Sequence, residues 1–476
     1  SANPSNPDPT DLAGALAAAK AGDVVTATPG DHLGPLTIPA GVTLTTDGST
    51  TTIRLPDEGD GPVIRMATGP EGTTGIEGVE IESSGVAALM VTGNGAARIV
   101  DVSVRATRGF GMIADGPSQL TLEDVRLTAQ PDDGRNLTYP IDPREWPSIG
   151  IASARVATVD FRQVDIVGWT GFGALLADLS GTWQGGEVSG NVGVGVLVDG
   201  GDLRLTDVYV LGTINCQDAS CAQNKTFGVA ATDGAVLSTT NLRLEDNAGV
   251  GLLHQAAKGS HGDLISVANG DAGVWIQDVE SSDELPSLAL TGANSDILEN
   301  GGGGVVVLRS GGVTMEDINV CKTASREVSC GDDCATRIAD GIHVAQMRGD
   351  LALRNIKIDV DNALGDGRVG ILVDGEDHAE GTVVNMAGVM VVGEQGNGCV
   401  LQRGSWDTLD EWEVDISDDL TNADAQLKDA GGVLSVTAPL GDLPSAGLIG
   451  ENGLIGENGL IGENGLIGEN GLIGEN

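Results

Sequence analysis

Short apolar runs separated by turns fill most of this 476-residue chain, and one arrangement of them recurs. Each copy opens with glycine and a short apolar strand and passes through a turn into an alternating strand. A polar residue, usually Asp or Asn, then precedes a closing apolar–x–apolar pair. The clearest copies are 111–127, 195–210, 228–244, 304–320 and 341–358. This pattern predicts three short strands per unit rather than helices.

The apolar positions recur every 22 or 23 residues. They include Val79, Val102 and Val125, then Ile81, Val104 and Leu127, then Ile166, Val188 and Val210. A unit of this size cannot bury its apolar face alone, but stacked units share one continuous core. We therefore predict a solenoid lined by columns of Val, Ile and Leu, in which residues one unit apart are neighbours.

The repeat resembles that of the right-handed parallel β-helix of pectin-lyase-like proteins. The start of the chain is similar too, because a helix is predicted at 10–21, with Thr10 or Asp11 as its N-cap and Gly22 at its end. Such a helix covers the apolar end of the stack. The resemblance implies an all-β, right-handed parallel β-helix of about 12–13 coils over residues 9–440. A polar segment (1–8) precedes it, and a linker and tail (441–476) follow it.

Composition and charge narrow the choice of partners. Glycine accounts for 73 residues, aromatic residues for 3 %, and the formal net charge is −44. A field of that sign repels phosphate backbones and anionic lipid surfaces, which argues against a nucleic-acid partner. The charge is compatible with bound divalent cations, so Ca²⁺ is the metal to consider, although no motif requires a cofactor.

The expected compartment follows from two features: the chain has no long apolar run, and it starts with a polar stretch. No apolar run approaches the ~18 residues that a membrane-spanning helix needs. The chain opens on a polar, Ser/Asn/Pro-rich stretch without Met, which is typical of a mature form after signal removal. Such a stretch also suits a tether below a lipid anchor, although the residue that would carry a lipid is absent. We expect an extracellular or cell-surface protein.

The six cysteines favour the same compartment. They are Cys216, Cys221, Cys321, Cys330, Cys334 and Cys399. Their spacings match no standard zinc pattern, so disulfides that pin loops in an oxidising compartment are the preferred interpretation. Cys216–Cys221 is the best candidate pair. One further bond is expected among Cys321, Cys330 and Cys334, which leaves one of these three for Cys399 or unpaired.

The most unusual non-repeating stretch is 129–150. It is polar and proline-rich, so we predict a long loop at one side of the solenoid, where function is commonly carried. Its sequence DPRE (142–145) is similar to the Asp-Pro-His motif of alginate epimerases, with arginine in place of the histidine that would transfer a proton. The candidate catalytic residues are Tyr139, Asp142, Arg144 and Glu145. An ordered decorative or docking loop without catalysis is the interpretation that the sequence favours for this stretch.

Other candidate chemistry is less specific. A lyase needs a base beside a neutralised uronate, and the chain offers two basic clusters without a family pattern. These are Arg98, Arg105 and Arg108, and Arg348, Arg354 and Lys357. The six tryptophans do not recur at one position of the repeat, so no aromatic ladder for neutral sugars is indicated, and Trp275 is expected to pack in the fold.

The chain ends in five uninterrupted copies of Gly-Leu-Ile-Gly-Glu-Asn at 447–476. A flexible linker or anchor, a cap on the chain's own β-helix, and an assembly element are the three interpretations. Perfect repetition of two large apolar residues per unit is more than a linker needs, which favours assembly or docking. The candidate assembly residues are Leu448, Ile449, Leu454, Ile455, Leu460, Ile461, Leu466, Ile467, Leu472 and Ile473.

These observations favour a structural or adhesive β-helix protein. Its tail would mediate self-association, as in a filament, or attachment to a cell-surface component. The alternative is a polysaccharide-active protein, either a lyase- or epimerase-like enzyme or a carbohydrate-binding surface protein without catalysis.

Overall fold

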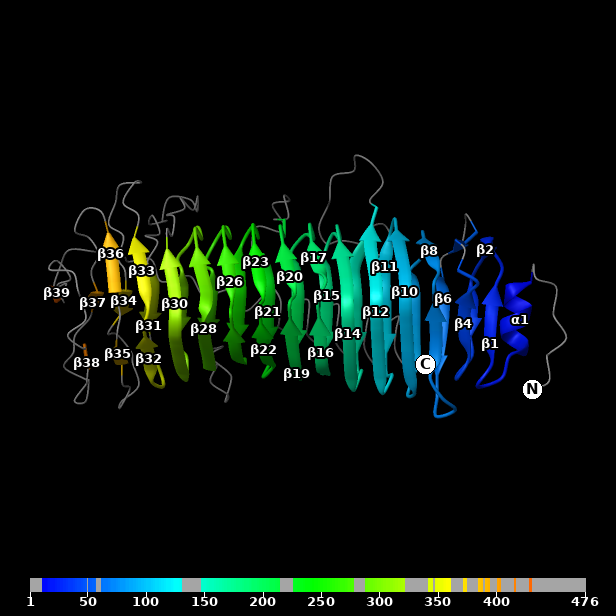
Figure 1. The fold of residues 1–476 in the computed structure, drawn as a ribbon, viewed down its shortest axis with the longest axis horizontal. Coiled ribbons are helices and arrows are strands. Elements are labelled where there is room, and N and C mark those ends of the chain that lie inside the picture. Colours follow the sequence, from blue (N-terminus) through cyan, green and yellow to red (C-terminus); the bar gives the residue numbers. More distant parts are fainter. Residues whose placement is uncertain are drawn as a thin grey trace. The chain divides into compact units, whose positions relative to one another are not determined.

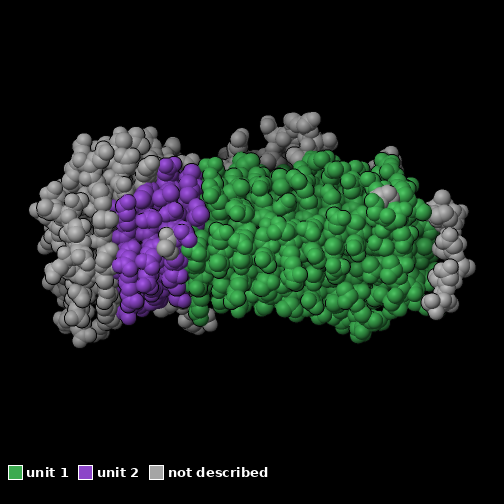
Figure 2. Space-filling model, in the orientation of Figure 1, with its two compact units in different colours: residues 1–214, 227–247, 257–264 green, residues 215–226, 248–256, 265–476 purple. Residues whose placement is uncertain are grey.

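A computed structural model describes most of the chain up to residue 360 and short strands beyond it (Figure 1). The described residues are 11–48, 50–56, 61–130, 147–214, 226–277, 287–321, 341–345, 347–360, 371–374, 384–387, 390–393, 400–403, 415–416 and 428–429. They divide into two compact units. Unit 1 comprises 1–214, 227–247 and 257–264, and unit 2 comprises 215–226, 248–256 and 265–476 (Figure 2).

Each coil of unit 1 contributes a first and a third strand to one parallel sheet, sheet A. In unit 1 its strands are β1 (Val24–Ala27), β2 (Gly30–Leu33), β4 (Thr43–Thr46), β5 (Thr51–Arg54), β7 (Thr74–Glu77), β8 (Glu80–Ser83), β10 (Ala96–Ala106), β12 (Gln119–Ala129), β14 (Thr158–Val167), β16 (Ser180–Gln184), β17 (Glu187–Ser189), β19 (Asp202–Thr206), β20 (Tyr209–Leu211), β22 (Val236–Thr240), β23 (Arg243–Glu245) and β25 (Lys258–Gly262). In β10, β12 and β14 the first and third strands run together as one long strand.

The remaining strand of each coil lies in a second parallel sheet, sheet B. In unit 1 its strands are β3 (Leu36–Ile38), β6 (Pro62–Thr68), β9 (Ala87–Gly93), β11 (Gly109–Asp115), β13 (Pro147–Ala154), β15 (Phe172–Ala177), β18 (Val194–Asp199) and β21 (Phe227–Thr232). Two parallel sheets joined coil by coil around one core make the fold a parallel β-helix, as the sequence predicts.

Unit 2 is built in the same way. Its sheet A strands are β26 (Ile265–Val267), β28 (Ser287–Leu298), β30 (Gly312–Cys321), β32 (Leu351–Arg354), β33 (Lys357–Val360), β35 (Val384–Ala387), β36 (Met390–Gly393) and β38 (Asp415–Ile416). Its sheet B strands are β24 (Val250–Gln255), β27 (Val274–Gln277), β29 (Val305–Leu308), β31 (Ile342–Ala345), β34 (Ile371–Asp374), β37 (Val400–Arg403) and β39 (Lys428–Asp429). Sheet B therefore has 15 strands among the described residues, and the architecture is the parallel β-helix solenoid that the sequence predicts.

The predicted core columns are confirmed by the strand register. Ile81 pairs with Val104 and Val104 with Leu127, while Ile166 pairs with Val188. Their side chains are at most 1 % exposed. Because parallel strands place in-register residues on one face, each column is a line of branched apolar side chains that runs through the stack.

The recurring Asp or Asn before the closing apolar pair marks a left-handed turn. Asp101, Asp124, Asp207 and Asn241 have φ between 50° and 55°, and each sits between the first and third strand of its coil. Asp and Asn tolerate this backbone conformation better than other residues with a side chain. This requirement explains the polar residue that the sequence repeat shows at that position.

The start of the chain forms the predicted helix, α1 (Leu12–Ala18), somewhat shorter than 10–21. The Asp11 carboxylate accepts a hydrogen bond from the Gly14 N–H at 2.8 Å, so Asp11 is the N-cap. Leu12 and Leu16 are buried, and the helix contacts β1 and β3, which is the place expected of a cap on the first coil.

Two features tighten the corner between the third strand and sheet B. A side chain at Gly173 would place its Cβ 2.5 Å from the Gly195 carbonyl oxygen, so the backbones of adjacent coils approach closely there. Beside it, the buried Asn191 accepts from the Trp169 N–H at 2.9 Å and donates to the Ile166 carbonyl at 3.4 Å. Asn191 thereby satisfies backbone groups of the preceding coil that the corner leaves without strand partners.

Candidate functional site

Most residues selected from the sequence lie outside the described strands. Tyr139, Asp142, Arg144 and Glu145 lie outside the described residues, between β12 and β13. The ten repeat leucines and isoleucines also lie outside them, as do all the cysteines except Cys321. Cys321 is half-buried at the end of β30. The predicted catalytic loop, disulfides and assembly role stay predictions.

Two of the intervals between described strands lie at the same place in the coil. Interval 131–146 leaves the third strand of its coil and enters a strand of sheet B, and interval 215–225 does the same between β20 and β21. Both insertions therefore join the solenoid at the same kind of turn, beside the outward face of the third strands. This face is the described surface nearest in sequence to the predicted loop.

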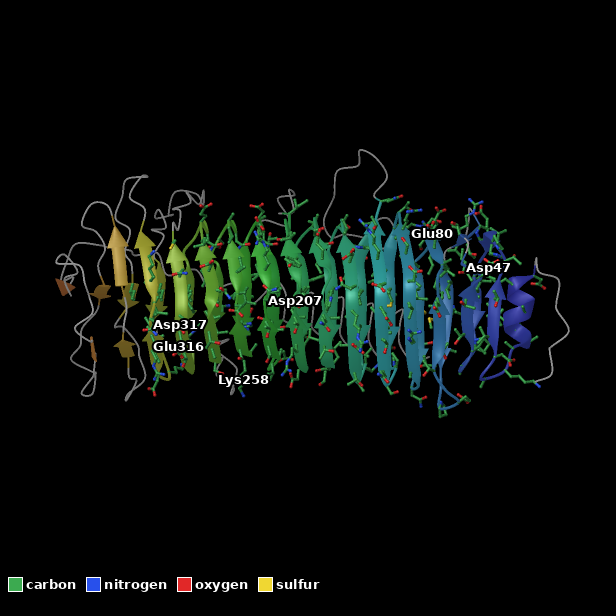
Figure 3. The ribbon with its side chains drawn as sticks, in the orientation of Figure 1. Asp47, Glu80, Asp207, Lys258, Glu316 and Asp317 are labelled. Atoms are coloured by element: carbon green, nitrogen blue, oxygen red, sulfur yellow. The ribbon has the colours of Figure 1, made fainter. Side chains whose placement is uncertain are left out.

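Two of the three arginines in the first basic cluster, Arg98 and Arg105, are neutralised by carboxylates on this sheet. Arg98 pairs with Glu123 at 3.1 Å, and Arg105 pairs with Glu80 at 3.3 Å, in both cases with a carboxylate one coil away. Figure 3 shows Glu80 on β8, with Asp207 and Lys258 further along sheet A of the same unit. Because their charges are paired, these arginines do not form a cationic patch that would attract an anionic ligand.

The most distinctive surface lies on β17, β20 and β23. Tyr209 is 41 % exposed and is the aromatic member of the exposed large apolar side chains among the described residues. It is in register with Glu187 on one neighbouring coil and with Arg243 on the other. Coils are stacked at about 4.8 Å, so an acid, an aromatic ring and a guanidinium follow one another along the stack. We call Glu187, Tyr209 and Arg243 the Tyr209 row.

Arg243 is held in place by a carboxylate on its own strand. Its Nε donates to Glu245 Oε2 at 2.6 Å, and both side chains are about one-third exposed. This hydrogen bond raises the pKa of Arg243 above its ordinary value, so the guanidinium stays charged. On the other side, the Glu187 N–H donates to the Asp165 carboxylate at 3.0 Å. The row thus offers a fixed cation, an exposed ring and carboxylates to one ligand.

One carboxyl of sheet B titrates abnormally. Asp199 is 8 % exposed, and burial raises its pKa to about 6, although a 2.8 Å hydrogen bond from the Thr232 hydroxyl partly opposes that shift. Asp233 and Asp178, on the neighbouring coils, raise it further. Such a group could exchange a proton near neutral pH, but it lies on sheet B, away from the Tyr209 row.

One buried histidine of unit 2 is structural. His254 of unit 2 is fully buried, and loss of solvent lowers its pKa to about 3, so it stays neutral in the core. Among the residues that the structure describes, no group of three or more His, Cys, Asp and Glu side chains is placed to hold a metal ion. None of the described helices is long and apolar enough to cross a membrane.

Sequence reasoning did not select the Tyr209 row. The signal was present, because the spacing of 22 between Glu187 and Tyr209 places them in one column. The next member, Arg243, is displaced by the interval 215–225, which breaks the count and hides the column.

Comparison with known proteins gives fold-level likeness. No protein-family profile and no curated protein matches this chain in sequence. Among solved structures, it is similar to the A-module of the Azotobacter vinelandii mannuronan C-5 epimerase AlgE6 (13 % identity, 83 % of this chain, 94 % of that chain, TM-score 0.22).

It is also similar to a PL6 alginate lyase in complex with a trisaccharide (10 % identity, 85 % of each chain, TM-score 0.30). It is similar as well to the endo-xylogalacturonan hydrolase of Aspergillus tubingensis (11 % identity, 83 % of this chain, 90 % of that chain, TM-score 0.16). At such identities and scores these names assign no activity to this chain, and the argument returns to its own residues.

Proposed function

We propose that the protein recognises a polysaccharide on the outward face of its third strands, with the Tyr209 row as the binding site. The observation that carries the proposal is the exposed ring of Tyr209, placed in register between Glu187 and Arg243. An aromatic ring packs against the apolar face of a sugar, while a carboxylate and a guanidinium bind its hydroxyl or carboxylate groups. Such a row fits an extended polymer better than a compact ligand.

The direction of the solenoid suits a polymer as well. Equivalent positions recur once per coil, so successive sugar units meet successive side chains of one column. Long structural polysaccharides lie outside the cell or on its surface, and we propose the same location for the protein. If the polymer is anionic, Ca²⁺ would bridge its carboxylates to a chain whose net charge is −44.

Affinity electrophoresis tests the site. Alginate, pectate and neutral β-glucans serve as immobilised ligands, and Tyr209→Ala is compared with the wild type and with Val236→Ala, an exposed apolar side chain on a first strand. We expect retardation by at least one polymer, lost in Tyr209→Ala, kept in Tyr209→Phe and unchanged in Val236→Ala. Equal retardation of wild type and Tyr209→Ala would refute the site.

Turnover distinguishes an enzyme from a binding protein. Lyase- or epimerase-type chemistry requires a proton acceptor beside a neutralised uronate, and Tyr139, Asp142, Arg144 and Glu145 are the candidates for it. Unsaturated uronate is followed by absorbance and C5 inversion by NMR, with Ca²⁺ and with chelator. Product that disappears in Asp142→Asn and Arg144→Ala supports an enzyme. Binding without product supports a carbohydrate-binding protein.

The structural or adhesive role is the second candidate, and the terminal repeat favours it. Ten large apolar residues at fixed intervals in 447–476 are suited to association between chains. Electron microscopy of the full chain beside a chain ending at Ser445 tests this role. Filaments or ordered oligomers that vanish on truncation support it, and single particles in both samples count against it.

A further inference from the structure

The surroundings of Tyr209 carry an excess of negative charge. Arg243 is the cation of the Tyr209 row, but its Nε lies 2.6 Å from Glu245 Oε2, so its charge is already balanced on its own strand. Among the residues that the structure describes, Glu187 takes part in no ion pair, and neither does Asp207, two residues before Tyr209. The ring of Tyr209 therefore has two carboxylates near it that no cation contacts.

Glu187 is the acid of this column that a ligand can use. It is exposed on β17 and is in register with Tyr209, one coil away. The acid one coil further back, Asp165, is engaged, because its Oδ1 accepts the Glu187 N–H at 3.0 Å. Arg126 is in register with Asp165, so this arginine lies nearer to Asp165 than to Glu187. The side-chain charge of Glu187 is thus left for a ligand.

Asp207 is held in a fixed position at the turn before β20. Its φ of 55° places it in the left-handed region between β19 and β20, and its side chain is exposed on sheet A (Figure 3). Asn241 Nδ2 donates to Asp207 Oδ1 at 2.7 Å, which orients the carboxylate and leaves Oδ2 for a donor of the ligand. A second carboxylate thus flanks the outward face from which Tyr209 projects.

An exposed ring flanked by carboxylates is suited to an ammonium group. The face of a tyrosine ring attracts a cation that lies within about 6 Å of it, and a carboxylate accepts a charge-assisted hydrogen bond from the same cation. The spacing of about 4.8 Å between coils puts both kinds of contact within reach of one ligand group. The net charge of −44 adds a long-range attraction for cations and a repulsion of anions.

We propose that the polymer bound by the Tyr209 row is an amine-bearing polysaccharide, whose ammonium groups pair with Glu187 and Asp207 while a sugar ring packs on Tyr209. This inference rests on the proposed function and names its substrate class. Arg243, whose charge Glu245 balances, keeps N–H groups that can donate to hydroxyl or acetyl oxygens of the same polymer.

A basic peptide would offer the same ammonium chemistry, but the position of Tyr209 in the sheet favours a polysaccharide. β20 is paired with β17 on one side and with β23 on the other, so its backbone groups are already used within the sheet. An extended peptide gains much of its affinity by adding a strand to an open sheet edge, and no such edge exists at β20. A sugar chain needs only the side chains.

Two matched ligands test the charge of the substrate. A β-1,4-linked glucosamine hexamer and its fully N-acetylated counterpart share one backbone and differ in their ammonium groups. Calorimetric titration of the full chain at about pH 6 keeps both carboxylates and amines charged. We expect the glucosamine hexamer to bind at least about tenfold more tightly than the acetylated one, and Tyr209→Ala to weaken both.

Two double variants separate the site from the net charge. The site variant combines Glu187→Gln with Asp207→Asn, since asparagine tolerates the left-handed turn. The control combines Glu77→Gln with Asp202→Asn, two exposed acids elsewhere on sheet A, and changes the net charge by the same amount. We expect the site variant to bind the glucosamine hexamer about tenfold more weakly and the acetylated one as before, and the control to behave as the wild type.

Four other outcomes overturn the inference. Equal or tighter binding of the acetylated hexamer, dependent on Tyr209, would reject the amine and keep the proposed function. Absence of binding by either hexamer and of retardation by every polymer would reject both. A preference for glucosamine that survives in the site variant, or falls equally in the control, would reflect net charge alone. Tighter binding of a lysine hexapeptide, lost in the site variant, would make a basic peptide the ligand.

Discussion

The two outward faces of unit 1 are built from the same coils and yet differ completely. On sheet A, strands such as β16, β19 and β22 alternate between buried and exposed residues, and polar side chains face the solvent. On sheet B, every residue of β15, β18 and β21 is buried. Alternation along a strand thus corresponds to one wet face, whereas a continuous apolar run corresponds to a sheet covered on both sides.

The difference shows that stacking of the coils fixes the spacing between strands but not the polarity or exposure of the side chains on each face. Both faces have the same register and the same spacing of about 4.8 Å. The two faces nevertheless differ in exposure: Tyr209 on sheet A is 41 % exposed, whereas Leu197 on sheet B is buried.

Leu197→Ala should give the largest effect on stability. Leu197 is fully buried, so the lost side chain leaves a cavity that costs about 3 kcal/mol of unfolding free energy. Arg204→Ala, on the exposed face of the same coil, should cost about 0.5 kcal/mol or less. Urea unfolding of both variants measures the contrast, and equal, small losses would show that the sheet B face is bare.

Asp199→Asn tests how the buried carboxyl of Asp199 on sheet B makes stability depend on pH. The pKa of Asp199 is raised from 3.8 to about 6 in the folded chain, so the folded state holds a proton that the unfolded state releases between these values. Stability should therefore fall as pH rises through this window, by up to about 3 kcal/mol, and remain lower above it.

The asparagine variant lacks this titration, so it should be more stable than the wild type at pH 7.5 and lose the advantage near pH 4. The urea midpoints of wild type and Asp199→Asn at the two pH values test this expectation. Asp202→Asn, at an exposed position of β19, is the control. Parallel pH profiles for wild type and Asp199→Asn would contradict the assignment.

Asn191→Ala compares a buried asparagine with an exposed one. Asn191 bridges two coils through hydrogen bonds to Trp169 and Ile166, and its loss leaves buried backbone groups unpaired. The expected cost is about 2 kcal/mol. Asn241→Gly removes a 2.7 Å bond to Asp207 on the exposed face, keeps a residue that adopts the left-handed φ of 54°, and should cost less than about 1 kcal/mol. Thermal unfolding ranks the pair, and a reversed order would show that the corner does not depend on Asn191.

The smallest effect is expected at Arg243. Its ion pair with Glu245 is about one-third exposed on each side, so Arg243→Ala should change stability by about 0.5 kcal/mol or less, and high salt should erase the difference. The same variant should weaken polysaccharide retardation clearly. A large loss of stability would mean that Arg243 is a structural residue and would weaken the proposed site.

Much of the fold could be predicted from local rules. The spacing of Ile81, Val104 and Leu127 gave the columns, because parallel stacking puts residues one coil apart in contact. The capping helix followed from Asp11 and the turn after it.

The site was harder to predict than the fold. A column such as Glu187–Tyr209–Arg243 exists only when insertions are subtracted from the count, and the sequence does not say which residues are insertions. The burial of Leu197 was also invisible, because an apolar strand reads the same whether its second face is covered or bare.

The strict register of the coils has a consequence for how the molecule can change length. Ser180 pairs with Asp202, 22 residues later, and Val188 pairs with Val210 at the same offset. Removing 180–201 would join Leu179 to Asp202 and leave each column with one member fewer but no change of phase. Unit 1 can therefore gain or lose one coil by duplication or deletion of a segment of this length, while its other coils keep their own side chains and surfaces.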